Sequence, residues 1–207
     1  IIGSGLILWF LTLQIPDFGS YENRLIAEST KLYDRTGKVL LYNAHDQIRR
    51  TVVTLPQISD YAEKAAIAIE DSNFYRHYGI EPASIVRAVL VNINTGRLEQ
   101  GGSTITQQVI KNTLLTQDKK ITRKIKEWIL SLKLERKLTK NQILELYLNE
   151  IPYGGSIYGI EEAARAYFGK KAADITLAEA AYLAALPQAP SYLSPYGSNT
   201  DKLEERK

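Results

Sequence analysis

The stretch IAIEDSNFYRHYG, residues 67–79, carries an apolar run directly into two adjacent carboxylates, Glu70 and Asp71. If the helix continues for one more turn, Phe74 and His77 fall on the same side as this pair, because residues three or four apart are neighbours on a helix. Such a group of side chains at the end of a buried helix indicates a corner of an active site. The pattern is also typical of an ordinary solvated helix end that carries a structural histidine.

Helix signals recur from residue 59 onwards, on both sides of this stretch. The spacing of a capping box predicts helix starts at these pairs: Asp60 with Glu63, Thr104 with Gln107, Thr139 with Gln142, and Thr176 with Glu179. Helix ends are predicted at Gly169 and before Pro187, because glycine suits the left-handed residue after a helix and proline cannot continue one. We therefore predict a mainly α fold.

Residues 29–55 follow a different pattern, with the short β-type runs LYD, VLLY and TVVTL. The sequence DRTG, residues 34–37, supplies turn residues between the first two runs. We predict a small N-terminal β hairpin region, contained in a connecting segment that covers residues 17–58.

The opening sequence IIGSGLILWFLTLQIP, residues 1–16, is apolar and uncharged. It is shorter than the roughly 20 residues that a membrane-spanning helix needs. The lack of early charges favours the outer half of a truncated membrane anchor. The alternatives are the apolar region of a signal peptide and a core helix.

The composition excludes several classes of site. The 207 residues, of which 44% are hydrophobic, can bury the core of one large domain or of one domain with appendages. No cysteine is present, so the chain has neither disulfides nor thiolate metal ligands, and His45 and His77 are too far apart to suggest a zinc motif. The net charge of +3 is modest, and we expect no nucleic-acid partner.

The sequence KKITRKIKEW, residues 119–128, concentrates positive charge and indicates a local anion site. On a helix, Arg123 and Lys124 lie four and three residues before Glu127, so two cations crowd one carboxylate. The apolar side predicted to bury this helix consists of Ile125, Trp128, Ile129 and Leu132. The alternative is a solvated basic face with intrahelical ion pairs.

Two further stretches could contribute to a site. In QGGSTITQQVIKN, residues 100–112, two glycines precede a Ser/Thr-capped helix start, whose N–H groups could hold a phosphate oxygen. The ending of a Walker loop is missing, and the alternative is an ordinary capped helix with Gln107 as the capping partner of Thr104. The sequence KNQILELYLN, residues 140–149, predicts a buried helix. We expect Glu145 and Asn149 to orient neighbouring elements, and the alternative is that they are partners for the site.

In this order, EDSNFYRHYG, GGSTITQQ, RKIKE and KNQILELYLN resemble the successive motifs of the peptidoglycan glycosyltransferases of family 51. GIEEAARAYFGK and LAEAAYLAALPQAPSYLSP resemble the later part of that family, so the resemblance covers about Tyr61–Pro195. It implies a lysozyme-like, two-lobed helical domain, which we place at residues 59–195. Residues 196–207 would begin a linker to an absent domain.

The sequence YDRTGKVL, residues 33–40, resembles the region that precedes this domain in bifunctional class A penicillin-binding proteins. Those proteins add a transpeptidase, whose Ser-x-x-Lys and Lys-Thr-Gly motifs do not occur here. The penicillin-reactive half is therefore expected to be absent from this sequence. The resemblance makes a C-terminal transpeptidase domain a candidate part of the full-length protein.

The resemblance implies polymerisation of lipid II into β-1,4-linked glycan strands. Lipid II supplies the acceptor 4-hydroxyl, the growing lipid-linked strand is the donor, and a lipid diphosphate leaves. The expected location is the extracytoplasmic face of the bacterial cytoplasmic membrane, with a single-pass anchor.

The resemblance also assigns roles to residues that match the family motifs. Glu70 matches the general base, and Glu127 matches the second catalytic glutamate, near the donor diphosphate. There Glu127 would either hold a divalent cation, Mg²⁺ or Mn²⁺, or orient the cationic groups. No organic cofactor is expected. The matching substrate-binding positions are Asp71, Phe74, His77, Ser103, Thr104, Gln107, Gln108, Lys111, Arg123 and Lys124. Cations among them would stabilise the negative charge that gathers on the leaving group.

Two other functions fit parts of the sequence. A lysozyme-like hydrolase would also use two carboxylates in a helical cleft, but it has no diphosphate leaving group for Arg123, Lys124 and Lys111 to bind. A non-catalytic module anchored in the membrane could use the basic helix to hold anionic lipids. Such a module would not depend on Glu70.

Overall fold

The structure, a computed structural model, describes residues 30–33, 35–36, 40–44, 49–84, 87, 102–114 and 121–207. This part of the chain is mainly helical, which confirms the predicted fold class. The helices are α3 (Asp60–Glu70), α5 (Ile105–Leu114), α6 (Ile121–Lys137), α7 (Lys140–Glu150), α8 (Ile160–Phe168), α9 (Leu177–Ala185) and α10 (Thr200–Arg206). Short 3-10 helices are η1 (Leu55–Gln57), η2 (Phe74–Arg76) and η3 (Ala172–Asp174).

The predicted anchor at residues 1–16 lies outside the described residues. Within the described ranges, no helix has both the length and the hydropathy of a membrane span. The chain divides into two compact units. Of the described residues, Glu70–Tyr147 form the first unit, and residues 30–69 together with Leu148–Lys207 form the second. The predicted domain boundaries stay predictions.

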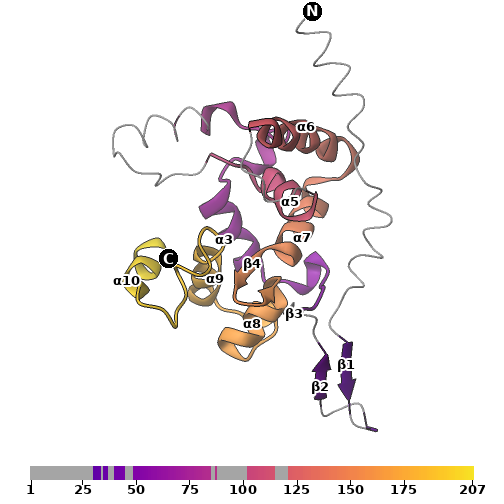
Figure 1. Ribbon diagram of the computed structural model, residues 1–207, viewed down its shortest axis with the longest axis vertical. Helices are drawn as coiled ribbons and strands as arrows, with labels where there is room; N and C mark the ends of the chain where they lie inside the picture. The colour runs from indigo at the N-terminus through magenta and orange to yellow at the C-terminus, as the bar shows by residue number, and fades with distance from the viewer. Residues whose placement is uncertain are drawn as a thin grey trace, which may run out of the picture. The chain divides into compact units, whose positions relative to one another are not determined.

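In the first unit, α5 packs against α6 (Figure 1). The buried side of α6 carries Glu127, Leu130, Ser131 and Leu134, whose spacing is that of one helix face. The predicted apolar side was wrong, because Trp128 and the other members of that set are half-buried. The reason is tertiary: α5 covers the Glu127 side of the helix, and a side chain on Gly79 would meet Ser131 O at 2.9 Å.

In the second unit, α8 lies beside a small sheet (Figure 1) of order β3-β5-β4, where β3 is Arg49–Arg50, β4 is Pro152–Gly154 and β5 is Ile157–Tyr158. Asn149 clamps the segment next to β3: its Oδ1 accepts from Val53 N at 3.0 Å, and its Nδ2 donates to Val53 O at 2.8 Å. Gly159 has φ +81°, and a Cβ there would lie 2.8 Å from Asn149 O. These contacts confirm that Asn149 orients its neighbours.

The predicted hairpin is confirmed as the antiparallel pair β1 (Thr30–Tyr33) and β2 (Leu40–Ala44). The prediction of a strand at TVVTL was wrong, because residues 51–54 are irregular and lead into η1. Side chains replace the backbone pairing of a strand in this segment. Asn149 satisfies both backbone groups of Val53, and the Thr51 hydroxyl donates to Glu162.

Helix ends follow the predicted signals with one exception. The boxes at Thr104, Thr139 and Thr176 each form their reciprocal hydrogen bonds. α3, in contrast, begins one residue earlier than expected, since Ser59 Oγ accepts from Tyr61 N at 3.3 Å. Gly169, at φ +66°, ends α8.

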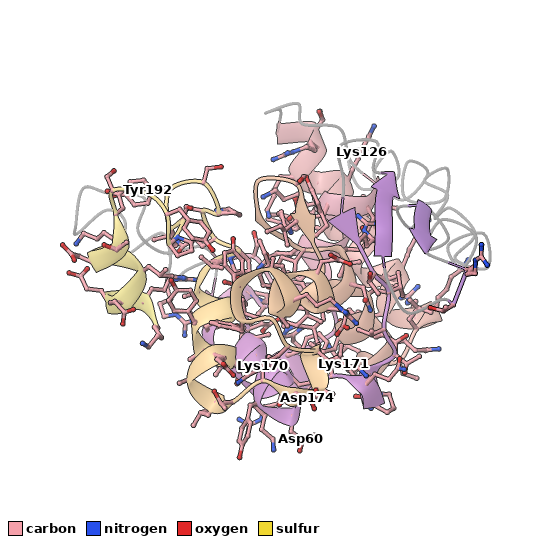
Figure 2. All side chains as sticks on the ribbon, turned by 90° about the horizontal axis from the view of Figure 1, so that it is seen from below. Asp60, Lys126, Lys170, Lys171, Asp174 and Tyr192 are labelled. Carbon is pink, nitrogen blue, oxygen red and sulfur yellow. The ribbon has the colours of Figure 1, made fainter. Side chains whose placement is uncertain are left out.

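The turn between α8 and α9 is anchored at both ends. Lys170 pairs with Glu179 at 2.7 Å, and this bond together with the Thr176 backbone N–H lowers the pKa of Glu179 to about 2. Ser59 N donates to Ala172 O at 3.0 Å, which ties the turn to the start of α3. Figure 2 shows this neighbourhood, with Lys170, Lys171, Asp174 and Asp60 labelled.

Candidate active site

Glu70 is the last residue of α3, and α5 holds its carboxylate. Gln108 Nε2, in the first turn of α5, donates to Glu70 Oε2 at 2.6 Å. This bond fixes the direction of the carboxylate relative to α5. A general base needs such a defined direction, because proton transfer requires the base within hydrogen-bond reach of the proton.

Asp71 is a buried anchor for the start of α5. Its side chain is 1% exposed, and its carboxylate accepts from Ile105 N at 3.0 Å and from His77 Nε2 at 2.9 Å. The first N–H groups of a helix have no partner within the helix, and a negative charge at that end is stabilised by the helix dipole. Asp71 therefore joins the end of α3 to the beginning of α5.

His77 completes this anchor between the loop and Asp71. Gly79 N donates to His77 Nδ1 at 3.1 Å, so Nδ1 carries a lone pair and the ring proton must be on Nε2, which donates to Asp71. Thr104 Oγ1 donates to Gly79 O at 2.7 Å, which closes the ring of contacts from the loop to α5. Both ring nitrogens of His77 are thus used within the protein, as in the structural alternative.

We predict that Asp71→Ala lowers the free energy of unfolding by about 2–3 kcal/mol, because the His77 Nε2–H and the Ile105 N–H lose their acceptor in a buried setting. Urea unfolding followed by circular dichroism measures the change. Asp174→Ala, at an exposed position in η3, is the control and should change stability by less than about 0.5 kcal/mol. Equal stability of the two variants would contradict the anchor role of Asp71.

Side-chain hydrogen bonds also hold the described loop that follows α3, at residues 73–84. Asn73 Nδ2 donates to Glu81 Oε1 at 2.6 Å, and the Ser84 hydroxyl donates to the same carboxylate. The Ser84 bond is the main cause that holds the pKa of Glu81 below its ordinary value. The carboxylate stays ionised and keeps residues 73–81 in one turn.

The N-terminus of α5 has the predicted capping box. Thr104 N donates to Gln107 Oε1 at 3.0 Å, and Gln107 N donates to Thr104 Oγ1 at 3.2 Å. Thr104 and Gln107 are 3% and 0% exposed, so neither presents a polar group at the surface. Gln107 Nε2 is buried without a hydrogen-bond partner among the described residues.

A charged group lies against the residue that precedes this box. Lys124 Nζ donates to Ser103 Oγ at 2.9 Å and to the Glu127 carboxylate, one turn further along α6. The Glu127 side chain is 2% exposed, whereas that of Lys124 is 38% exposed. The ammonium group therefore compensates a buried carboxylate and still reaches solvent.

The start of α5 is where these groups meet: Gln108 holds Glu70, the N-terminus holds Asp71, and Ser103 holds Lys124. The profile of a family described as transglycosylase matches residues 37–207. The chain belongs to the transglycosylase family. This confirms the resemblance to the family 51 glycosyltransferases, and the domain is a peptidoglycan glycosyltransferase.

Similar full-length proteins support this membership. Penicillin-binding protein 1A of Aquifex aeolicus is 42% identical over 204 residues, which are 98% of this chain and 28% of that protein. The Pseudomonas aeruginosa protein of the same name is 40% identical over 95% of the chain and 24% of its own length. The Escherichia coli K12 protein is 41% identical over 90% and 22%. The chain thus spans about a quarter of the length of these relatives.

The other cations expected in the transglycosylase site differ in their surroundings. Arg123 Nε is buried and has no hydrogen-bond partner within the described ranges. Lys111 is exposed near the end of α5. Figure 2 shows the labelled Lys126 side chain directed away from the ribbon, in contrast to Lys124, which turns toward Ser103. Lys119 and Lys120 of the same basic run lie outside the described residues.

Phe74 packs as a core residue in this transglycosylase. It is 0% exposed, and its ring lies edge-on to His77, with 6.2 Å between centroids. Lys140 Nζ lies 4.5 Å from the centroid of the Phe74 ring. The geometry therefore gives Phe74 a packing role beside the Asp71 anchor.

One buried polar group near the candidate site, Glu135, was not predicted from the sequence. Glu135 Oε1 on α6 accepts from Thr106 Oγ1 at 2.6 Å and from Lys140 Nζ at 2.7 Å. A signal was present, because Glu127, Ser131 and Glu135 follow one another at spacings of four residues on α6. Because these polar residues lie beside the buried Leu130 and Leu134, they are predicted to form hydrogen bonds with side chains from other elements.

The described residues do not build a metal site on their own, since they contain no group of three or more acidic or histidine side chains that could hold an ion. Glu127 is one carboxylate, already paired with Lys124. Mg²⁺ is commonly bound by one or two carboxylates together with substrate phosphates. A cation at Glu127 would therefore need oxygens from the substrate, and the metal expectation stays a prediction.

Proposed function

We propose that the domain polymerises lipid II into β-1,4-linked glycan strands, with Glu70 as the general base. Glu70 takes the proton of the acceptor 4-hydroxyl while that oxygen attacks the anomeric carbon of the growing strand. The bond from that carbon to the diphosphate oxygen breaks, and the diphosphate keeps the electron pair. The observation that carries the proposal is that Gln108 in α5 holds Glu70, while Ser103, two residues before α5, holds the cationic group through Lys124.

The cationic group supports a diphosphate leaving group. Lys124 has a partly exposed ammonium, and Arg123 has a buried N–H without an acceptor among the described residues. Phosphate oxygens suit both, because charge-assisted hydrogen bonds to arginine and lysine are strong. Preorganised cations lower the barrier by stabilising charge that develops as the bond breaks. Glu127 would keep Lys124 in place, and a divalent cation would share the diphosphate charge when bound.

A hydrolase remains the alternative, because two carboxylates also suit glycosidic cleavage. The partly exposed Lys124 ammonium and the buried Arg123 N–H favour the transferase, because both suit a diphosphate and a hydrolase releases none. A lipid-binding module would use these cations but would not need a carboxylate held by Gln108.

Location and partners follow from the substrate. The domain would act on the extracytoplasmic face of the bacterial cytoplasmic membrane, where lipid II and the lipid-linked strand are found. The relatives are named as penicillin-binding proteins and are about four times as long as the matched region. A transpeptidase domain in the full-length protein is part of the same proposal.

We predict that the chain, incubated with lipid II, produces lipid-linked glycan polymers that can be resolved by gel electrophoresis. A matched incubation with finished peptidoglycan should release no soluble fragments. Lysis of the finished polymer without polymerisation would replace the transferase by a hydrolase. Binding of lipid II without either reaction would favour the lipid-binding module.

A further inference from the structure

Glu135 on α6 forms hydrogen bonds with residues of two other helices, α5 and α7. Its side chain is 4% exposed, and one carboxylate oxygen accepts from Thr106 on α5 and from Lys140 on α7. A buried carboxylate is costly unless it is paired and hydrogen-bonded. These contacts satisfy it, and they also fix α5 and α7 against α6.

The same group supports the loop that follows Glu70. The Lys140 ammonium, which donates to Glu135, also lies over the Phe74 ring, 4.5 Å from the ring centroid. At Gly79, with φ +83°, an added Cβ would lie 3.1 Å from Glu135 Cγ. The backbone of the loop therefore lies directly on α6 at Glu135.

Thr106 and Gln108 lie on opposite sides of α5. Two residues along an α-helix rotate the side chain by about 200°. Thr106, which is 0% exposed, points to Glu135, and Gln108 reaches Glu70. The hydrogen bond from Thr106 to Glu135 therefore fixes the rotation of α5 and with it the direction of the Gln108 side chain.

We infer that Glu135 is a positioning residue, which fixes the rotation of α5 through Thr106 so that Gln108 holds Glu70. This inference rests on the proposed function for its effect on turnover. The contact between Thr106 and Glu135 can be tested without measuring turnover, so a failure of the inference can be told apart from a failure of the proposed function.

The test compares Thr106→Val with Thr113→Val in the full chain. Thr113 is on the same helix, but among the described residues its hydroxyl donates to Val109 O, at 2.7 Å, within that helix. We expect Thr106→Val to lower kcat for lipid II polymerisation about tenfold, with KM within about twofold, since one buried hydrogen bond is lost. Thr113→Val should keep kcat, and Thr106→Ser should restore it. A kcat for Thr106→Val equal to that of Thr113→Val would overturn the inference.

A double-mutant cycle distinguishes positioning from general destabilisation. In a Gln108→Ala background, adding Thr106→Val should change kcat by less than about twofold. The reason is that Thr106 acts on Glu70 through Gln108, so its effect is already lost when Gln108 is removed. Additive losses would overturn the inference. Glu135→Gln, which keeps the size of the side chain, is the second variant if Thr106→Val does not fold, and it should lower kcat about threefold.

The readout independent of turnover is the side-chain amide resonance of Gln108 in a ¹⁵N NMR spectrum. It should shift in Thr106→Val and stay in place in Thr113→Val. If Thr106→Val shifts the Gln108 resonance but the unsubstituted chain makes no polymer from lipid II, the Glu135 contact is supported and the proposed function is rejected. An unchanged resonance in Thr106→Val would overturn the contact, whatever the turnover.

Discussion

Glu70→Gln should lower lipid II polymerisation at least about 100-fold, because a general base typically contributes a factor of this size or more. The amide cannot accept the proton of the attacking hydroxyl. Folding should survive, since glutamine has nearly the same volume and its Oε1 can still accept from Gln108 Nε2, which lies 2.6 Å from Glu70 Oε2. Polymer yield over time measures the turnover, and thermal unfolding measures the fold.

The matched control is Glu63→Gln. Glu63 lies on the same helix two turns earlier, half-buried, where burial is the main cause that raises its pKa. It has no place in the proposed chemistry, so its variant should retain wild-type turnover. Retained turnover above a few per cent in Glu70→Gln would count against Glu70 as the base.

The helix starts could be predicted because their information is local. The boxes at Thr104, Thr139 and Thr176 each join a residue to the one three positions later. The start of α3 was misplaced by one residue because both Ser59 and Asp60 can cap a helix. The structure uses Ser59, whose hydroxyl also donates to Ile175 O at 3.2 Å. That distant contact is invisible in the local pattern.

The buried face of α6 could not be predicted from periodicity. The set around Trp128 is the more apolar one, yet the set around Glu127 is buried. Tertiary contacts decide, because Lys124 compensates the Glu127 charge and α5 covers this side. TVVTL failed for a related reason, since Asn149 satisfies the backbone of Val53 from a position 96 residues away.

For the candidate site, the motif order predicted which stretches take part, and the structure shows which of their side chains are in contact. The predicted continuation of the helix past Glu70 was wrong, because α3 ends at Glu70 and Phe74–Arg76 form the separate 3-10 helix η2. Sequence spacing also could not show that Asp71 binds the N-terminus of α5. Nor could spacing predict the role of Glu135, because its hydrogen-bond partners, Thr106 and Lys140, lie on other helices. Residues that act through other residues have no fixed spacing from the carboxylate they support.

Lys124→Ala should reduce polymerisation about 100-fold and also lower stability. The loss of turnover reflects one missing preorganised donor to the leaving diphosphate. The loss of stability arises because Glu127, at 2% exposure, would keep a buried charge without the Lys124 ammonium. Removing one partner of a fully buried pair costs about 3–5 kcal/mol. We expect about 2 kcal/mol here, because the Lys124 side chain is 38% exposed and partly screened.

The double variant Lys124→Ala/Glu127→Gln separates these two effects. Replacing the carboxylate by an amide removes the uncompensated charge, so the free energy of unfolding should return to within about 1 kcal/mol of the wild type. Turnover should stay low, because the diphosphate still lacks its cation. Lys126→Ala, two residues away and directed outward in Figure 2, is the control and should keep both quantities. Unchanged donor affinity and turnover in Lys124→Ala would exclude the phosphate contact. Recovery of turnover in the double variant would leave Lys124 with the structural task of neutralising Glu127 alone.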